Sequence, residues 1–255
     1  MIRRTSPPGA PPPLEGLLAG LRLAIGAENA SAQRAALLEV GDWPGLEALA
    51  AYHRVSSLFL RGVANAGVRL PDQAVADALT RMRQRDAVRG LRQLAAMHRI
   101  IAALDAAGIP SLVLKGLPLG QRAYGDPFAK RSIDVDLLVP EDVVPAAADV
   151  LRTLGWRRVM PAFRETPLRR RWYDSVQKED VFTGGGAKVE LHRRLFGNRF
   201  LFNPSFDRVQ AAAATVAIGT RCFRTLGDAD QLLYLACHGA LHFWYRLKWL
   251  CDFAA

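Results

Sequence analysis

The sequence predicts an α/β protein of the α+β kind, with a mixed sheet of about five strands between residues 109 and 200 and helical regions on either side. Three observations predict this fold class. Apolar residues recur at helical spacing from Leu14 to about Ala107. From Ile109 the pattern changes to short apolar runs separated by glycine, proline and charged residues, as in strands and turns. A second helical pattern begins at Asp228.

Composition narrows the class of protein. The chain has 255 residues, half of them hydrophobic, which suffices for one large domain or two small ones with a buried core. The formal net charge of +10 favours polyphosphates, nucleic acid or acidic membranes, although an arginine excess also aids solubility and accompanies GC-rich coding sequences. The cysteines Cys222, Cys237 and Cys251 have no CxxC spacing, which argues against a disulfide framework and a thiolate zinc site.

Targeting signals are not evident in the sequence. No uninterrupted apolar run of about 18 residues occurs, so we expect no membrane span. The N-terminus breaks into prolines where a secretory signal would have its apolar core. Together with the cysteine pattern, this predicts a cytoplasmic protein.

Four segments are expected along the chain. Residues 1–13 are proline-rich and without apolar periodicity, which predicts a disordered tail. An N-terminal helical domain follows at 14–108 and the sheet-containing core at 109–202. Residues 203–255 would hold a small hairpin and a C-terminal helical region. The last helical pattern is still running at Ala255, which is compatible with a longer natural protein.

The stretch Arg131–Val139 holds the first candidate site residues. Strict alternation from Ile133 to Leu137, followed by an apolar run, predicts a mostly buried strand with Asp134 and Asp136 on one face. Two like charges on such a strand cost free energy unless a cation lies between them, and a divalent metal ion is the usual one. The alternative is an exposed strand edge with two solvated aspartates.

A short apolar strand at 111–114 precedes Lys115 and Gly116, and a helix is expected to begin near Leu117. Strand, glycine and helix start is a geometry that aims backbone N–H groups and a helix dipole at an anion, with Lys115 as a point charge for phosphate. The alternative is an ordinary glycine turn. Lys130 and Arg131 are further cations that lead into the carboxylate strand.

A glycine-rich loop at 183–188 between two apolar runs predicts an antiparallel hairpin. On its return strand, Lys188, Glu190 and His192 face the side opposite to Val189. Glu190 is therefore a third acid on a strand.

His238 and His242 lie four residues apart on one face of the helix that begins at Asp228, which is a metal-ligand spacing. However, Gly239 stands where a zinc protease has glutamate, and no third ligand is evident. We therefore expect these histidines to serve packing or substrate contact.

With these residues in this order, the chain resembles a poorly characterised group of bacterial nucleotidyltransferases that belong to the DNA polymerase β-like superfamily. The resemblance covers roughly residues 45 to 255 and is carried by the segments Leu112–Pro118, Tyr124–Pro127, Arg131–Val139, Val189–His192, Asp230–His238 and Trp244–Asp252. Two features depart from the wider superfamily. Lys115 precedes the glycine where serine or glycine is usual, and Glu190 stands where aspartate is commoner.

The resemblance implies a polymerase β-like core and an enzyme that moves a nucleoside monophosphate from an NTP to a hydroxyl-bearing acceptor, releasing pyrophosphate. It also implies two Mg²⁺ ions, or Mn²⁺ in their place, held by Asp134, Asp136 and Glu190, which are also the catalytic residues. Nucleotide and phosphate contacts would come from Lys115, Gly116, Lys130, Arg131 and His192. His238 and His242 are candidates for substrate contact.

The sequence leaves the acceptor open between a small molecule, a peptide or protein, and RNA. It also leaves open the NTP used and the oligomeric state. Two alternatives to this function are a catalytically weak nucleotide-binding module that regulates a partner, and a nucleotidyltransferase that modifies tRNA or another RNA. The arginine-rich helical segment between residues 81 and 99 favours the RNA alternative, but such charges more often form a solvated face.

Overall fold

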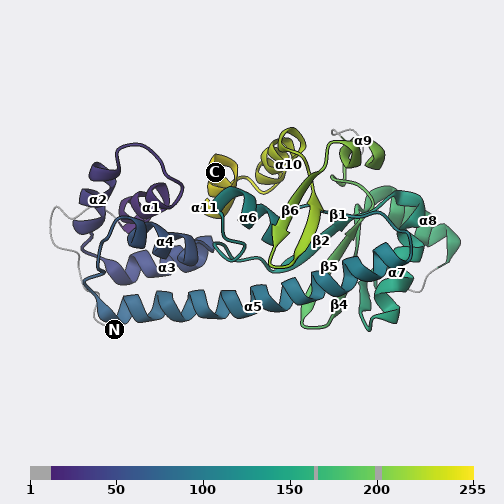
Figure 1. Ribbon diagram of the computed structural model, residues 1–255, viewed down its shortest axis with the longest axis horizontal. Coiled ribbons are helices and arrows are strands. Elements are labelled where there is room, and N and C mark those ends of the chain that lie inside the picture. Colours follow the sequence, from purple (N-terminus) through teal and green to yellow (C-terminus); the bar gives the residue numbers. More distant parts are fainter. Residues whose placement is uncertain (1–12, 164–165, 199–202) are drawn as a thin grey trace. The chain divides into compact units, whose positions relative to one another are not determined.

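The computed structural model describes residues 13–163, 166–198 and 203–255 (Figure 1). Residues 1–12 of the predicted tail therefore lie outside the described residues, and Pro13 is the first residue of a helix. None of the described helices is long and apolar enough to cross a membrane.

The chain divides into two compact units. The first, here called the helical unit, comprises the chain up to Val88, Phe128–Arg131 and Leu235–Ala255. The second, the sheet unit, comprises Arg89–Pro127 and Ser132–Tyr234.

The helical unit contains α1 (Pro13–Ala24), α2 (Ala30–Leu38), α3 (Trp43–His53), α4 (Ser56–Asn65) and α11 (Leu247–Ala254). It also contains the first part of α5 (Gln73–Ala106) and the last part of α10 (Asp228–Leu241). Helix α1 packs against α2, α3 and α4. A Cβ atom on Gly62 of α4 would lie 1.8 Å from the carbonyl oxygen of Gly20 on α1, so the two helices cross at a pair of glycines.

The sheet unit is built on seven strands in the order β3-β4-β5-β2-β1-β7-β6. These are β1 (Leu112–Val113), β2 (Asp134–Leu138), β3 (Arg157–Met160), β4 (Glu179–Gly184), β5 (Ala187–His192), β6 (Ala214–Ile218) and β7 (Arg221–Thr225). The pairs β2/β5 and β1/β7 are parallel and the others antiparallel. The predicted α/β fold with a mixed sheet is thus confirmed.

Short helices connect these strands. They are α6 (Leu117–Tyr124), the 3₁₀ helix η1 (Glu141–Val143), α7 (Val144–Thr153), α8 (Pro167–Val176) and α9 (Phe206–Ala211). Helix α6 begins directly after the Lys115–Gly116 turn, with Gly116 as its N-cap residue. Pro118 lies in the first turn of α6, where backbone N–H groups have no partner within the helix. Proline has no N–H group, so it fits this position.

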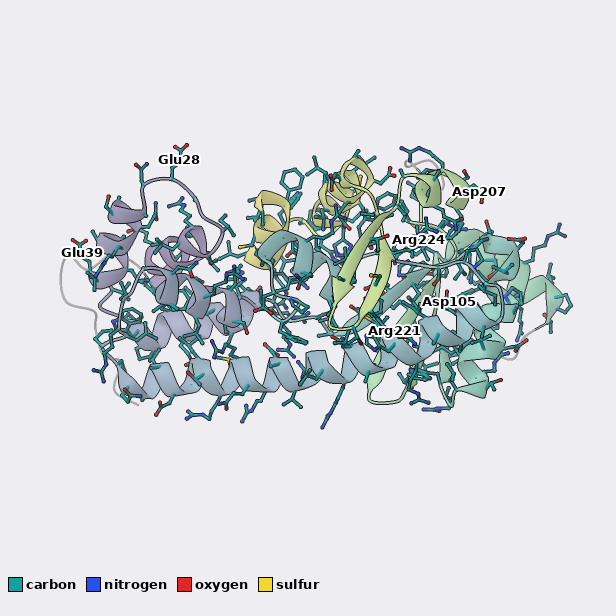
Figure 2. All side chains as sticks on the ribbon, viewed as in Figure 1. Glu28, Glu39, Asp105, Asp207, Arg221 and Arg224 are labelled. Atoms are coloured by element: carbon teal, nitrogen blue, oxygen red, sulfur yellow. The ribbon has the colours of Figure 1, made fainter. Side chains whose placement is uncertain are left out.

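The second predicted hairpin, β6–β7, belongs to the same sheet as the five strands expected between residues 109 and 200. Thr225 on β7 pairs with Val113 on β1, and its hydroxyl donates a hydrogen bond of 2.6 Å to the Val113 carbonyl oxygen. Phe223 and Thr225 are buried, whereas Cys222 and Arg224, which alternate with them along the strand, are exposed (Figure 2 labels Arg224). The alternation therefore turns one face of β7 toward the core.

Strand β2 lies near the middle of the sheet, between β1 and β5. Its apolar residues Val135 and Leu137 are buried, as the alternating pattern predicts. In the parallel register with β5, Asp134 pairs with Lys188 and Asp136 pairs with Glu190. Paired residues of neighbouring strands point to the same face, so this register gathers the charged side chains of both strands.

The glycine-rich loop between β4 and β5 is a two-residue turn. Gly185 and Gly186 have φ angles of +54° and +76°, which only glycine adopts readily. A Cβ atom on Gly185 would lie 2.6 Å from the buried ring of Trp156. The turn and its packing against Trp156 therefore account for these two glycines.

Candidate active site

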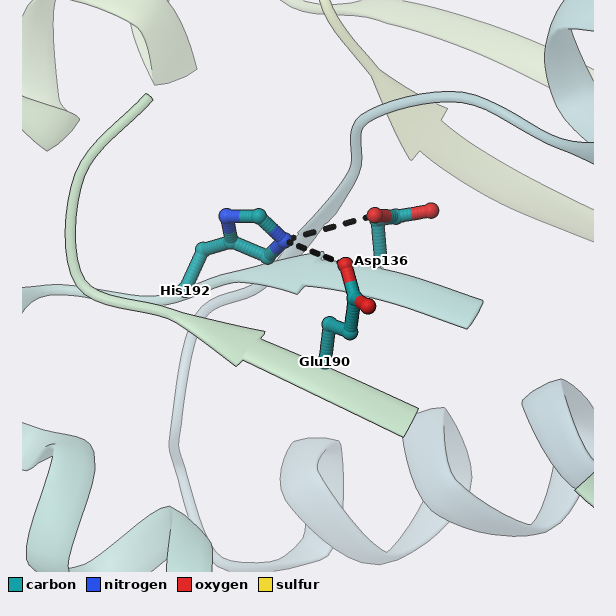
Figure 3. A group of neighbouring side chains, drawn as sticks. All are labelled: Asp136, Glu190 and His192. Carbon is teal, nitrogen blue, oxygen red and sulfur yellow. Dashed lines mark hydrogen bonds and ion pairs between the residues drawn. The ribbon is translucent and has the colours of Figure 1, made fainter. Parts of the chain in front are cut away.

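Three side chains from β2 and β5 converge on one point (Figure 3). The Nε2 atom of His192 lies 3.3 Å from Oδ1 of Asp136 and 3.7 Å from Oε2 of Glu190. Potential metal-ligating atoms of the three residues all lie within 4.8 Å of one another. Among the described residues this is the one group of three or more such side chains. Asp136 and His192 are almost fully buried, so the group lies in a low-dielectric environment.

Lys115 approaches Asp136, and also Asp134 on the same strand, from the turn between β1 and α6. Its Nζ atom lies 2.6 Å from Oδ2 of Asp136 and 3.2 Å from Oδ1 of Asp134. Gly116 has a φ of +79° and a ψ of −128°, a conformation that residues with a Cβ rarely adopt. The glycine thus permits the turn that places Lys115 over the two carboxylates.

Sequence analysis did not single out Glu179, which also faces the cluster. Its Oε2 atom lies 3.2 Å from Nε2 of His192, because Glu179 on β4 is paired with His192 on β5. Lys178 forms an ion pair with Glu179 and lies 3.5 Å from Nδ1 of His192. A signal for Glu179 exists in the sequence, since counting back from a two-residue turn at Gly185 and Gly186 places it opposite His192.

Lys115, Asp134 and Asp136 shift one another's pKa values. Burial works against the charge of Lys115, but Asp136 and Asp134 hold its pKa well above the ordinary value. Burial likewise opposes the charge of Asp136, but Lys115 and His192 hold the pKa of that carboxyl well below the usual range. For Asp134, burial and the neighbouring charge of Asp136 raise the pKa. Asp136 is therefore a carboxylate and Lys115 an ammonium at neutral pH.

Burial also opposes the charges of Glu190 and His192. Hydrogen bonds from His192 and Lys188 and the charge of Lys115 together outweigh burial at Glu190, whose pKa is lowered. At His192, burial and Lys178 act to lower the pKa, but hydrogen bonds with Asp136 and Glu190 raise it. One Nε2–H group can donate to only one carboxylate, yet carboxylates of Asp136, Glu179 and Glu190 surround it. The cluster therefore retains oxygen atoms that a cation would satisfy.

Four other predicted site residues belong to the helical unit, whereas the carboxylate cluster belongs to the sheet unit. Lys130 forms an ion pair with the buried Asp252, and Nε of Arg131 lies 3.6 Å from Oδ1 of Asp86. The rings of the remaining two, His238 and His242, lie 4.7 Å apart, centroid to centroid. The ring of His242 also stacks on that of Trp249, with the ring centroids 4.8 Å apart.

A comparison with protein families defines the class of this protein. The sequence profile of a nucleotidyltransferase family matches residues 39–255, so the chain is an enzyme of the nucleotidyltransferase kind. It belongs to the family described as "Uncharacterised nucleotidyltransferase". This result confirms the reaction class expected from the sequence, the transfer of a nucleoside monophosphate. The assignment to the polymerase β-like superfamily stays a prediction.

Two solved structures are similar in part, and both are of the antibiotic-resistance factor ANT(2″)-Ia. Its solution structure shares 15% identity with this chain, covers 58% of this chain and 72% of its own, and gives a TM-score of 0.42. Its crystal structure with adenylyl-2″-tobramycin shares 14% identity, covers 63% and 85%, and gives a TM-score of 0.46. Similarity at this level bears on neither the substrate nor the mechanism of this chain. No curated protein matches it.

Proposed function

We propose that this chain transfers a nucleoside monophosphate from an NTP to a hydroxyl-bearing acceptor, with release of pyrophosphate, in a reaction that depends on a divalent metal ion. The observation that carries the proposal is the convergence of Asp136, Glu190 and His192 beside the ammonium of Lys115. Transfer from an NTP needs charge neutralisation at the phosphates and a group that accepts the acceptor's proton, and this cluster offers both.

The donor set fits Mg²⁺ or Mn²⁺. Carboxylate oxygens suit both ions, and the imidazole nitrogen of His192 suits Mn²⁺ better than Mg²⁺. Asp136, Glu190 and His192 would hold the ion, and Asp134 would hold Lys115 in place. When bound, the ion would supply neutralisation of charge on the phosphate and a lowered pKa for the acceptor hydroxyl.

The protein side chains would perform the remaining steps. Glu190, whose pKa lies below the ordinary value, is ionised and able to accept the proton of the acceptor hydroxyl. The ammonium of Lys115 and the backbone N–H of Gly116 would donate hydrogen bonds to the departing pyrophosphate.

The other predicted contacts stay proposals. Lys130 and Arg131 would bind phosphate only by exchanging their carboxylate partners Asp252 and Asp86 for phosphate oxygens. His238 and His242 are proposed to contact the acceptor. The acceptor itself is a small hydroxyl compound, a peptide or protein, or an RNA end. The net charge of +10 favours an anionic acceptor, such as RNA, over a cationic one.

The test is an assay of pyrophosphate release and label transfer. Purified protein is incubated with each α-labelled NTP, Mg²⁺ or Mn²⁺, and pools of the three acceptor classes. We expect one NTP to support transfer, and Asp136→Asn to lower kcat/KM by about a thousandfold because it removes a carboxylate of the reaction centre. Asp149→Asn, on the exposed surface of α7, is the matched control and should leave the rate unchanged.

The same assay separates the alternatives. Calorimetric binding of an NTP without pyrophosphate release from any acceptor pool would support the regulatory module. Transfer to RNA alone, with an affinity that falls steeply as salt rises, would identify the RNA-modifying enzyme. Failure of every NTP to bind would refute the proposed function.

A further inference from the structure

The two side-chain oxygens of Asp136 face different cations or cation sites. Oδ1 lies 3.3 Å from Nε2 of His192, inside the group that also contains Glu190. Oδ2 lies 2.6 Å from Nζ of Lys115. One oxygen of this buried carboxylate is therefore directed to the potential metal site, and the other is already satisfied by an ammonium.

Lys115 fills the space between the two aspartates of β2. Its Nζ atom contacts both Asp134 and Asp136, at 3.2 and 2.6 Å. In a two-metal centre, an ion bridging these carboxylates would lie close to the same position. Such an ion would either displace the lysine or share a buried site with a second positive charge, and like charges in a low-dielectric site repel strongly. The residues present thus fit one ion well and a second ion poorly.

The charges around the site favour the same conclusion. Four carboxylates, those of Asp134, Asp136, Glu179 and Glu190, face the lysines of the same unit. Lys115 pairs with the two aspartates, while Lys178 and Lys188 pair with Glu179 and Glu190 respectively. Three lysines already neutralise all but one of these four negative charges, so one divalent ion is enough to reverse the sign, and a second would add two further positive charges to a buried site.

We propose that the reaction centre of this chain holds one divalent ion, on Asp136, Glu190 and His192, and that the ammonium of Lys115 takes the place of a second ion between Asp134 and Asp136. This inference rests on the proposed function and refines it. It replaces the two-ion arrangement that the family resemblance implies with one ion and one fixed ammonium.

The test counts bound Mn²⁺ by electron paramagnetic resonance, since free Mn²⁺ gives a strong signal that is lost on binding. The full chain is titrated with Mn²⁺ in the absence of nucleotide, because free nucleotide binds Mn²⁺ in solution and would disturb the count. We expect one Mn²⁺ per wild-type chain. Lys115→Gln, which keeps the length of the side chain and removes the charge, should open the second position and raise the count to two. Lys178→Gln removes the same charge from the same cluster without touching the aspartates, and its count should stay at one.

A second measurement examines the ligand set. Pulsed spectra of the wild-type complex should show coupling of Mn²⁺ to a nitrogen nucleus, and His192→Gln should remove that coupling and weaken Mn²⁺ binding by about tenfold or more. Circular dichroism confirms that each variant is folded. Adding α,β-methylene-ATP to the wild-type complex should leave the spectrum free of coupling between two manganese ions.

Three results would overturn the inference. They are two Mn²⁺ per wild-type chain, a spin-coupled manganese pair in the complex with α,β-methylene-ATP, and an unchanged count of one in folded Lys115→Gln. The absence of Mn²⁺ binding by the wild-type protein would also overturn it. By contrast, a count of one Mn²⁺ in a protein that binds no NTP would leave the metal site standing and refute the proposed function alone.

Discussion

Asp180 on β4 is a buried carboxylate that pairs with three arginines, and we predict that Asp180→Asn lowers the free energy of unfolding by about 3 kcal/mol or more. Its side chain is fully buried and accepts hydrogen bonds from three arginines. Arg170 donates two, at 2.7 and 3.1 Å, and Arg158 donates one at 3.3 Å. Arg193, the residue that follows β5, donates one more.

The magnitude follows from what the substitution leaves behind. The side chain of Arg193 is 1% exposed, and without the Asp180 charge its remaining carboxylate partner is Asp174. Breaking a buried ion pair by removing one partner costs about 3–5 kcal/mol, because the other charge stays buried without compensation. Asparagine keeps the shape and one acceptor oxygen, so the lower end of that range is expected. Such a loss is a large share of the roughly 5–15 kcal/mol that stabilises a folded domain.

The assay is urea denaturation followed by circular dichroism, with extrapolation of the unfolding free energy to water. The matched control is Asp149→Asn, which makes the same chemical change in the exposed ion pair with Arg152, whose side chains are 70% and 44% exposed. That pair should contribute less than about 1 kcal/mol, because water screens it. Equal losses in the two variants would refute the reasoning, since burial is what distinguishes the two sites.

Three further predictions concern single residues. Gly116→Ala should lower the free energy of unfolding by about 1–3 kcal/mol, because alanine rarely adopts the φ of +79° found there. An unchanged midpoint of urea denaturation would contradict this. Gln93→Met should raise the melting temperature, since both amide atoms of Gln93 are buried without a partner in the part of the chain that the structure describes, and such burial costs about 1–3 kcal/mol. A lower melting temperature would show that the adjoining pocket supplies a partner. Iodoacetamide at pH 8 should label the exposed Cys222 in the native protein and spare Cys251. The reason is that burial and Asp252 raise the pKa of the Cys251 thiol to about 12. Alkylated Cys251 in the mass spectrum of folded protein would contradict this.

Local pattern predicts the strands of this chain but not their order. The alternation around Val135 and the glycine turn at Gly185–Gly186 identify β2 and the β4–β5 hairpin, because each depends on residues near in sequence. The pairing of Val113 with Thr225 joins segments far apart in the chain. Nothing in either segment specifies the other, so the position of the β6–β7 hairpin beside β1 depends on tertiary packing.

In the site, too, local pattern predicts some features and tertiary packing decides others. Alternation along two strands places Asp136 and Glu190 each on one face, and parallel pairing then brings them together with His192. Sequence analysis assigned Lys115 to phosphate on the strength of the glycine that follows it. The distance from Lys115 to Asp136 depends on how β1 lies beside β2, which the sequence pattern does not contain.

The surroundings of Lys115 matter because the partners of a buried charge decide what else it can bind. A lysine that faces solvent at a helix start is available to an incoming phosphate. A lysine held by two carboxylates already has its charge matched, and a phosphate must compete with those carboxylates for it. An NTP that reaches Lys115 would therefore loosen its hold on Asp134 and Asp136 at the moment the triphosphate binds. Nucleotide binding and the affinity of this centre for cations should accordingly be coupled, and Mn²⁺ affinity measured with and without α,β-methylene-ATP reads that coupling directly.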